Sequence, residues 1–343
     1  MDPLTPVQRR LSPVMSQARF DVVGIGNAIV DVLSQAQPDF LTRHKLAPGS
    51  MALIDNAQAD ALYSQMGPGM EMSGGSAANT MAGIASLGGK GAYIGKVKND
   101  QLGKVFRHDL TAAGVAFDTT TLADGPSTAR CLIFVTPDAQ RTMTTYLGAC
   151  VELGPDDIDA RLVADSKVTY LEGYLWDPPQ AKEAFRKAIK IAHDAKRKVA
   201  LSLSDAFCVG RYRAEFLDLL NGGVDILFAN EAEIMSLFEL SDFDAAVPLI
   251  RNRCEVAVLT RSAKGAMVVA RDKTHMINAA PLGKVVDTTG AGDLYAAGFL
   301  FGYTQGYDHA TSGRIGSIAA GEVISHFGAR PETALAELIK RHL

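Results

Sequence analysis

The segment Val285-Val286-Asp287-Thr288-Thr289-Gly290-Ala291-Gly292-Asp293 decides how the rest of the chain is interpreted. It runs into Leu294-Tyr295-Ala296-Ala297-Gly298-Phe299-Leu300, an apolar stretch that favours a buried helix over a strand. Glycines in a turn before a helix let the backbone approach a ligand, and the unpaired N–H groups of the first helical turn attract an anion. The segment therefore predicts a phosphate site formed by Gly290, Ala291 and Gly292.

Asp293 stands at the beginning of this predicted helix. A carboxylate beside a polyphosphate is repelled unless it has a task, and accepting a proton from an attacking hydroxyl is such a task. An aspartate at the start of a helix is equally typical of a helix cap. By itself, the residue leaves both roles open.

The composition is that of a globular protein. The chain has 343 residues, enough for one large α/β domain with an appendage or for two ordinary domains. Apolar residues make up 47% and charged residues 21%, which excludes disordered and fibrous classes. The net charge is −4 without a long basic block, so we expect no nucleic-acid partner. No window approaches the roughly 18 apolar residues of a membrane helix, so we expect no membrane partner.

The cysteines and the N-terminus indicate a cytoplasmic location. The four cysteines lack CxxC spacing, which argues against a zinc site or a disulfide framework; they are Cys131, Cys150, Cys208 and Cys254. The first residues contain prolines and arginines but no continuous apolar run. We therefore expect a disordered tail over residues 1–19 and no secretory signal.

From residue 168 onward, strand patterns alternate with helix patterns. Strands are predicted at 168–171, 199–203, 225–229, 256–259 and 266–270, with helices near 180–197, 211–220 and from 231. This alternation predicts an α/β fold with a mostly parallel central sheet and helices on both faces. An amphipathic helix is expected at 331–343.

A hairpin pattern interrupts this rhythm. Residues 128–136 and 141–147 flank a turn at 137–140. We assign the hairpin to a small β lid that covers a cleft, built from about 34–72 and 116–150 within a domain spanning 20–343. Arg141 follows the turn, where it either points at phosphate or is an ordinary exposed arginine.

Polar residues near the N-terminus are candidates for substrate binding. Residues 20–32 are predicted to form a buried strand and a turn, and Ile29 replaces the third glycine of a dinucleotide fingerprint. Asn27 and Asp31 either hold neighbouring substrate hydroxyls or form turns with their own backbone. Gly74-Gly75 opens onto a helix of small residues in which Asn79 is either structural or a ligand contact.

Two further turns follow predicted strands. Asn230 and Glu233 lie in one, although acidic residues are common in any first helical turn. The other, Thr260 to Gly265, offers hydroxyls, cations and a glycine bend to phosphates. A P-loop is absent from the sequence, so phosphate must be held in another way.

Together these motifs resemble the ribokinase-like (PfkB) family of small-molecule kinases. The features that carry the resemblance are Gly74-Gly75 with Asn79, Asn230 with Glu233, Thr260 to Gly265, and the complete signature Asp287 to Asp293. Within the family, the stretch from about Val22 to Arg330 is most similar to the adenosine kinases. The resemblance implies a ribokinase-like fold and ATP-dependent phosphorylation of the 5′-hydroxyl of a nucleoside, with adenosine giving AMP.

The resemblance also implies roles for individual residues. Asp293 is the general base, Gly290 to Asp293 the anion hole, and Arg141 a cation that neutralises the phosphoryl group. Substrate contacts fall on Asn27, Asp31, Gly74, Gly75 and Asn79, with a wall for the base drawn from Tyr174, Leu175 or Trp176.

Cofactor sites follow from the same resemblance. Mg²⁺ is expected at Asn230 and Glu233 through water, and Asp287 with Thr289 resembles a segment that seats K⁺ in many relatives. ATP is expected against Asn230, Thr260, Arg261, Ser262, Gly265 and Thr289. A sugar kinase and a catalytically silent nucleotide-binding regulator remain as alternatives. The chain is expected to be a monomer or a homodimer, with a small-molecule substrate and ATP as its partners.

Overall fold

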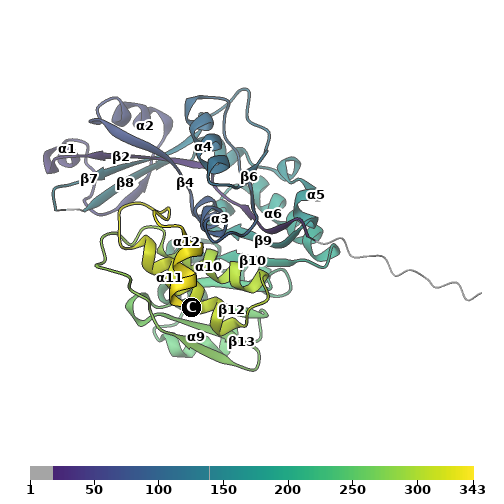
Figure 1. The fold of residues 1–343 in the computed structure, drawn as a ribbon. Coiled ribbons are helices and arrows are strands. Elements are labelled where there is room, and N and C mark those ends of the chain that lie inside the picture. Colours follow the sequence, from purple (N-terminus) through teal and green to yellow (C-terminus); the bar gives the residue numbers. More distant parts are fainter. Residues whose placement is uncertain (1–17, 139) are drawn as a thin grey trace, which may run out of the picture.

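The computed structural model describes residues 18–138 and 140–343 (Figure 1). The predicted tail, residues 1–19, falls almost entirely outside this range. Within it, the chain forms a nine-stranded sheet in the order β14 (Thr274–Ile277), β13 (Ala266–Ala270), β12 (Val256–Thr260), β11 (Ile226–Asn230), β10 (Lys198–Ser202), β9 (Ser166–Glu172), β1 (Phe20–Ile25), β5 (Gly91–Ile94), β6 (Ala116–Phe117). The strands from β12 to β6 are parallel, and only β13 and β14 pair antiparallel. The predicted mostly parallel sheet is confirmed.

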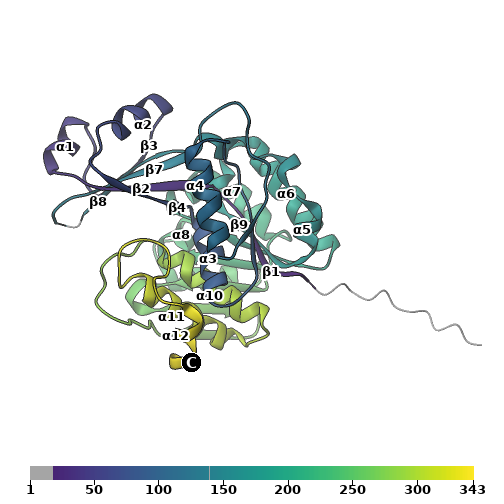
Figure 2. The ribbon, with the colours of Figure 1, turned by 45° about the horizontal axis from the view of Figure 1, so that its top comes forward.

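Helices cover both faces of this sheet (Figures 1 and 2). Strand β12 shows why, because Val256 and Val258 are buried in one core cluster while Ala257 and Leu259 are buried in the other. One face is covered by α3 (Ser76–Ser86), α4 (Gln101–Ala112), α10 (Ala291–Thr304), α11 (His309–Val323) and α12 (Leu335–His342). The other face is covered by α5 (Ala160–Ala164), α6 (Pro179–Asp194), α7 (Ala206–Leu220), α8 (Glu231–Phe238) and α9 (Phe243–Ile250).

Helix α10 is buried on nearly every side. It packs between α3 and α11, and Leu294 to Leu300 are all buried. Gly298 lets α11 approach, because a methyl group at this position would lie 2.6 Å from the Cα atom of Gly316. An apolar helix with a single polar end is thus fixed in the core, and only its first residues, Ala291 to Asp293, are partly exposed.

A second, five-stranded sheet projects from this body, at the upper left of Figure 1. Its order is β3 (Met51–Leu53), β8 (Arg141–Tyr146), β7 (Ala129–Val135), β2 (Ile29–Gln35), β4 (Gly69–Gly74). Val30 and Val32 point from β2 into a core shared with α1 (Pro38–Arg43) and α2 (Asn56–Tyr63). Because side chains alternate along a strand, Asp31 and Leu33 point to the opposite face.

The structure differs from the sequence prediction at both ends of the domain. Residues 20–32 were predicted as one strand and a turn, but the chain leaves the large sheet after Ile25 and continues as β2 of the small sheet. Gly26 allows this departure, since any side chain there would collide with Glu172 and Ala77. The C-terminal helix begins at Leu335 and not at Pro331.

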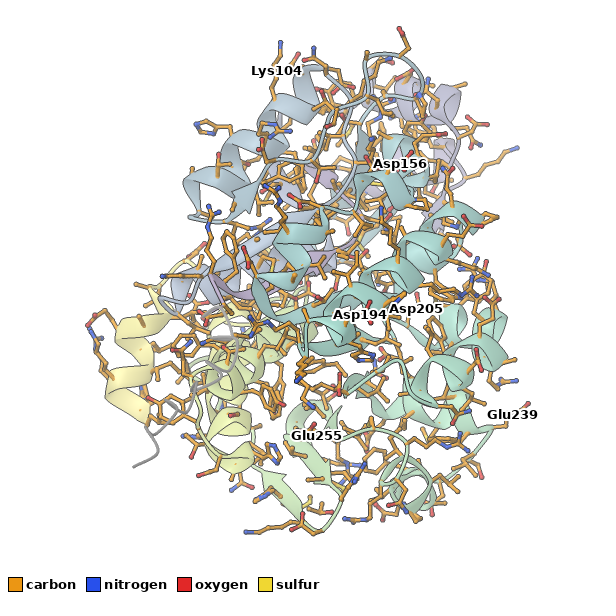
Figure 3. All side chains as sticks on the ribbon, turned by 90° about the vertical axis from the view of Figure 1, so that its right-hand side faces the viewer. Lys104, Asp156, Asp194, Asp205, Glu239 and Glu255 are labelled. Atoms are coloured by element: carbon orange, nitrogen blue, oxygen red, sulfur yellow. The ribbon has the colours of Figure 1, made fainter. Side chains whose placement is uncertain are left out.

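Figure 3 shows charged side chains such as Lys104 and Glu239 at the outer edge of the molecule. Among the residues that the structure describes, no helix has the length and apolar character needed to cross a membrane.

Two glycine substitutions test the helix packing. Gly298→Ala should lower the free energy of unfolding by about 1–3 kcal/mol, because its methyl group meets the backbone of α11. Gly210→Ala, in a helix where the new methyl group meets nothing within 4 Å, should raise it by about 0.4–1 kcal/mol. Urea unfolding measures both. Equal effects of the two variants would contradict the close approach of α10 and α11.

Candidate active site

The predicted site residues converge on one edge of the large sheet. Asn27, Asn230 and Thr260 stand at or just after the carboxyl ends of β1, β11 and β12, and parallel strands present these ends at the same edge. Asn230 and Thr260 are direct partners in the β11–β12 register. The N-terminus of α10 and one face of the small sheet meet this edge, as the contacts described below show.

The anion cradle is the start of α10. Gly290 has a φ of 77°, and a Cβ atom there would lie 2.8 Å from the Cα atom of Ala329, so only glycine fits. Within the described residues, the N–H groups of Gly290, Gly292 and Asp293 donate to no protein acceptor. The N–H of Ala291 donates to the carbonyl of Thr288 at 3.2 Å. Three amides therefore remain free to bind an anion, and the amide predicted at Ala291 is already used by the turn.

Asp293 is held by helix α3. Ser76 donates to its carboxylate at 2.6 Å and the side-chain amide of Asn79 donates at 3.0 Å. Asp293 makes no capping bond, since the N-cap is Gly290. Burial raises the pKa of Asp293, while the two hydrogen bonds and the charge of Arg330 oppose this rise. The geometry thus favours a held proton acceptor over a helix cap.

Asp31 lies beside the same cradle. Its carboxylate packs against Gly74, where any side chain would collide with it. Within the described residues this carboxylate accepts no hydrogen bond and forms no ion pair. Burial raises the pKa of Asp31 to about 7, opposed by the charges of Arg330 and Arg141. A substrate with hydroxyl groups finds free acceptor positions here.

Glu172, at the end of β9, was not predicted as a site residue. Its buried carboxylate accepts hydrogen bonds from the backbone of Asn27 at 3.3 Å, the side chain of Asn27 at 2.9 Å and the backbone of Ala77 at 2.8 Å. It fastens the turn after β1 to the first turn of α3. The amide nitrogen of Asn27, predicted to bind substrate, is therefore committed to Glu172. The sequence feature that could have identified Glu172 is an acidic residue directly after an apolar strand pattern.

Of the three residues predicted to form a wall for the nucleoside base, one lies at the surface and two lie in the core. Trp176 is fully buried, packs against Phe185 and Phe216, and donates its indole N–H to Glu215 at 3.0 Å. The prediction that Trp176 lines a base site is therefore wrong, and Leu175 is likewise buried in that core. Tyr174 is 37% exposed at the same turn.

The proposed magnesium residues form a capping pair. Glu233 accepts from the backbone of Asn230 at 3.0 Å and from its side chain at 2.5 Å. Burial raises the pKa of Glu233 to about 7, with Asp205 contributing. Within the described part of the chain, no three His, Cys, Asp or Glu side chains are arranged to hold a metal ion. Hard oxygen donors that act through water suit Mg²⁺, which keeps several waters and shares phosphate oxygens.

The carboxylate of Asp287 does not fit a potassium ion. One oxygen accepts from the backbone and hydroxyl of Thr289 at 3.1 and 2.8 Å, and the other accepts from Gly328 N at 3.0 Å and pairs with Arg141 at 2.8 Å. The carboxylate thus accepts three hydrogen bonds, and its negative charge is already paired with an arginine. The guanidinium of Arg141 already supplies the positive charge at this position.

Four of the residues predicted to bind ATP lie at the end of β12 or in the turn after it: Thr260, Arg261, Ser262 and Gly265. Thr260 ends the strand, and Ser262 and Gly265 shape the turn that follows, with φ angles of 51° and 82°. Arg261 is paired with Glu231 at 2.9 Å and lies over the ring of Phe243, so its charge is turned toward α8 and α9. Thr289 sits between Asp287 and Arg141.

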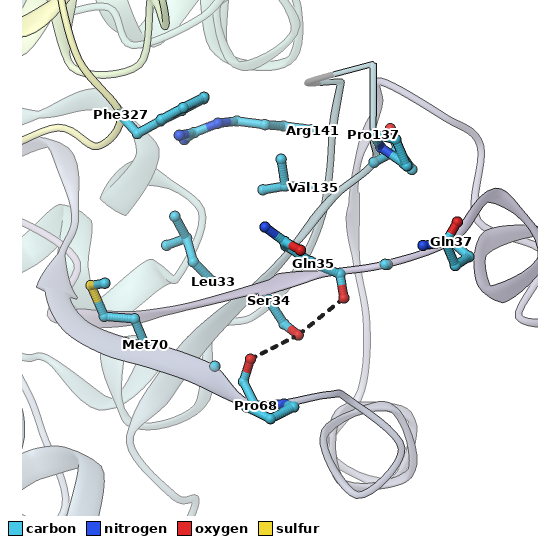
Figure 4. A pocket seen from close by; sticks show the side chains of 13 residues that line it. Leu33, Ser34, Gln35, Gln37, Pro68, Met70, Val135, Pro137, Arg141 and Phe327 are labelled. Atoms are coloured by element: carbon cyan, nitrogen blue, oxygen red, sulfur yellow. Dashed lines mark hydrogen bonds between the residues drawn. The ribbon is translucent and has the colours of Figure 1, made fainter.

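A cavity of about 790 Å³ lies under the small sheet (Figure 4). Its mostly apolar lining includes Leu33 from β2, Met70 from β4, Val135 from β7 and Phe327 from the main body. Arg141 crosses this space toward Phe327. Leu33 is two residues beyond Asp31 on the same face of β2, so the Asp31 carboxylate lies on the side of this strand that Leu33 presents to the cavity.

The segment Phe327–Arg330 also escaped prediction. Phe327 faces the cavity, Gly328 bonds Asp287, Ala329 packs on Gly290, and Arg330 donates to Ser73 at 3.1 Å. We call it the C-terminal strap. A loop has no periodic pattern of apolar residues. The sequence therefore contains no indication that these four residues lie beside the Asp287–Asp293 signature.

Comparison with known proteins identifies the family of this chain. The model of pfkB family carbohydrate kinases matches residues 59–334. The chain belongs to the pfkB family of carbohydrate kinases. It is therefore a kinase.

Known relatives in this family include nucleoside and sugar kinases. An adenosine kinase from Sinorhizobium meliloti is 53% identical, with a TM-score of 0.89 over 94% of this chain and 99% of that one. A probable sugar kinase from Rhizobium etli is 52% identical, with a TM-score of 0.89 over 95% of this chain and 99% of that one. The adenosine kinase of Saccharomyces cerevisiae is 26% identical over 90% of this chain and 95% of its own length.

The buried carboxylate of Glu172 generates a prediction. Burial raises the pKa of Glu172 from 4.5 to about 7, so the folded state binds a proton that the unfolded state has released. Wild-type stability should therefore fall as the pH rises from about 5 to 8. Glu172→Gln should flatten this slope by up to about 1.4 kcal/mol per pH unit, the value for one proton. Urea unfolding across this range measures it.

Glu183→Gln, an exposed change on α6, serves as the control and should keep the wild-type slope. An unchanged slope in Glu172→Gln would contradict the assignment of the titrating group.

Proposed function

We propose that this kinase transfers a phosphoryl group from ATP to the 5′-hydroxyl of adenosine, giving AMP. The observation that carries the proposal is the placement of two carboxylates in one cradle. Asp31 has free acceptor positions for neighbouring ribose hydroxyls, and Asp293 is held by Ser76 and Asn79 at the mouth of the amide cradle. A ribose bound by Asp31 can thus present its primary hydroxyl to Asp293.

Apolar surface beside the cradle favours a nucleoside over a free sugar. Leu33, Val135 and Phe327 line the adjoining cavity, and a flat heterocyclic base gains free energy by covering such surface. A free sugar leaves these side chains in contact with water. The likeness to a bacterial adenosine kinase at 53% identity supports the same choice.

In the proposed reaction, Asp293 accepts the proton of the attacking hydroxyl. Its raised pKa, caused chiefly by burial, makes it a better base than an exposed aspartate. The free N–H groups of Gly290, Gly292 and Asp293 stabilise the charge on the phosphoryl oxygens. Asn79 and Ser76 keep the carboxylate oriented, so no reorganisation is needed when the hydroxyl arrives.

Asn230 and Glu233 would hold Mg²⁺ through water at the neighbouring strand end. When bound, the ion neutralises charge on the ATP phosphates. Thr260, Ser262 and Gly265 shape the strand end against which we place the nucleotide.

The small sheet is proposed to act as a lid. Arg141 enters from β8 and reaches Asp287 and Thr289 at the edge of the anion cradle, which brings a positive charge beside the transferring group. A sheet lying over the cavity excludes water, and exclusion of water limits hydrolysis of ATP.

A sugar kinase is the second candidate, favoured by the likeness to a probable sugar kinase at 52% identity. A catalytically silent nucleotide-binding regulator is disfavoured. Such a protein does not require a proton acceptor, whereas Ser76 and Asn79 orient the carboxylate of Asp293 as a base would need.

Replacing the proposed base tests the mechanism. Asp293→Asn should lower kcat about 10²–10⁴-fold, the range for loss of a general base. Asp308→Asn changes an exposed N-cap on α11, where asparagine caps equally well, and should stay within about twofold of wild type. Coupled measurement of ADP release follows both variants. Activity of Asp293→Asn within threefold of wild type would exclude this role.

The acceptor is identified by a direct comparison. ATP is supplied with adenosine, inosine, guanosine, ribose or fructose, and the phosphorylated product is quantified. Adenosine should give the highest kcat/KM, because only a nucleoside fills both the cradle and the apolar cavity. Higher kcat/KM with ribose or fructose would establish the sugar kinase instead.

A further inference from the structure

We propose that Gln35 is a specificity-determining residue whose side-chain amide recognises the 6-amino group of adenine in the cavity under the small sheet. This inference rests on the proposed function and deepens it, because it assigns the preference for a 6-aminopurine to one side chain. Gln35 ends β2 and belongs to none of the motifs that predicted the site.

The amide of Gln35 points into a mostly apolar space. Figure 4 shows it between Leu33, two residues earlier on β2, and Val135 on β7. The strand register places Gln35, Val135 and Arg141 side by side on three neighbouring strands. Paired residues of adjacent strands share one face of a sheet, so all three side chains face the cavity.

This amide is free to bind a ligand, whereas neighbouring polar side chains of the lining are already bonded. Thr136 donates its hydroxyl to the carbonyl of Gln140 at 3.1 Å, and Arg141 is paired with Asp287 at 2.8 Å. The side-chain amide of Gln35 makes no hydrogen bond within the residues that the structure describes. It therefore offers both an acceptor and a donor to the cavity.

The backbone that carries this amide is held on both sides. The hydroxyl of Ser34 donates to the carbonyls of Gln35 and Pro68, at 3.3 Å each, and Figure 4 marks both bonds. The N–H of Ala36 donates to the carbonyl of Val135 at 3.0 Å. The end of β2 is thus tied to the segment before β4 and to β7, which fixes the origin of the Gln35 side chain.

The spacing along β2 suits a nucleoside. Asp31 and Gln35 lie on the same face, four residues apart, so their Cα atoms are about 13 Å from each other. A ribose bound by Asp31 can extend its base over Leu33, with the far edge of the base at Gln35. Gln37, whose amide is also free within the described residues, lies at the far end of the cavity from Leu33 (Figure 4).

The chemistry of the amide matches adenine. Adenine carries a donor, its 6-amino group, between two acceptors, N1 and N7. A glutamine amide can therefore accept from the 6-amino group and donate to the adjoining ring nitrogen, a pairing used widely for this base. A purine without the 6-amino group leaves the carbonyl of Gln35 unpaired in an apolar space, which weakens binding.

The test compares Gln35→Met, which keeps the length of the side chain and removes its polar atoms, with wild type. kcat/KM is measured with ATP and either adenosine or purine riboside, which lacks only the 6-amino group. The preference for adenosine should be about 3–10-fold greater in wild type than in Gln35→Met, the range for one neutral hydrogen bond. Because each preference compares two substrates of one enzyme, a general loss of activity cancels. Gln101→Met, an exposed change at the start of α4, is the control and should keep the wild-type preference.

Analogues of adenosine identify the ring nitrogen that receives the donor. Wild type should phosphorylate either 1-deazaadenosine or 7-deazaadenosine with a kcat/KM about 3–10-fold below that of adenosine, because one of the two lacks the acceptor for the amide N–H. This loss should disappear in Gln35→Met. An equal loss in wild type and in Gln35→Met would contradict the second hydrogen bond.

The outcomes separate this inference from the proposed function. If wild type phosphorylates sugars and neither nucleoside, the proposed function fails, and the role of Gln35 fails with it. If wild type phosphorylates both nucleosides and Gln35→Met keeps the wild-type preference for adenosine over purine riboside, the role of Gln35 alone is overturned.

Discussion

The hydrogen bonds from Ser76 and Asn79 to Asp293 are the constraint on which the rest of the site depends. They join the first turns of α3 and α10, whose residues lie 217 and 214 positions apart in the chain. Because α10 is locked between α3 and α11 by close backbone contacts, this carboxylate cannot shift without moving the core. The anion cradle, the acceptor carboxylate Asp31 and the strap are all arranged around that fixed point.

Local pattern was sufficient to predict most of the fold. The strand and helix alternation beyond residue 168 appears as β9 to β13 with α6, α7 and α8, since each of these elements buries a periodic apolar face. The path of residues 29–35 could not be predicted in this way. Val30 and Val32 suit either sheet, and the close approach of Glu172 and Ala77 to Gly26, where the chain leaves the large sheet, is not visible in any local window.

Side-chain partners were harder to predict than the positions of motifs. Asn27 follows the first strand as expected, yet its amide nitrogen is bound to a glutamate 145 residues away. Trp176 follows the right strand, but a 3₁₀ turn directs its indole into the core beside Phe216. Such outcomes depend on contacts between segments far apart in sequence, which no local window contains. The resemblance to the kinase family supplied such long-range information only for motifs that match the family, such as Asp287 to Asp293.

The way in which the small sheet is connected has a consequence for how such kinases diversify. Strand β2 continues directly from β1, β4 leads directly into α3, and β7 with β8 is inserted between β6 and β9. The sheet is thus an elaboration of loops at one rim, and the parallel scaffold beneath is uninterrupted by it. Side chains of this small sheet can therefore be substituted without altering the large sheet. Acceptor specificity can change in this way while the residues proposed for phosphoryl transfer stay the same.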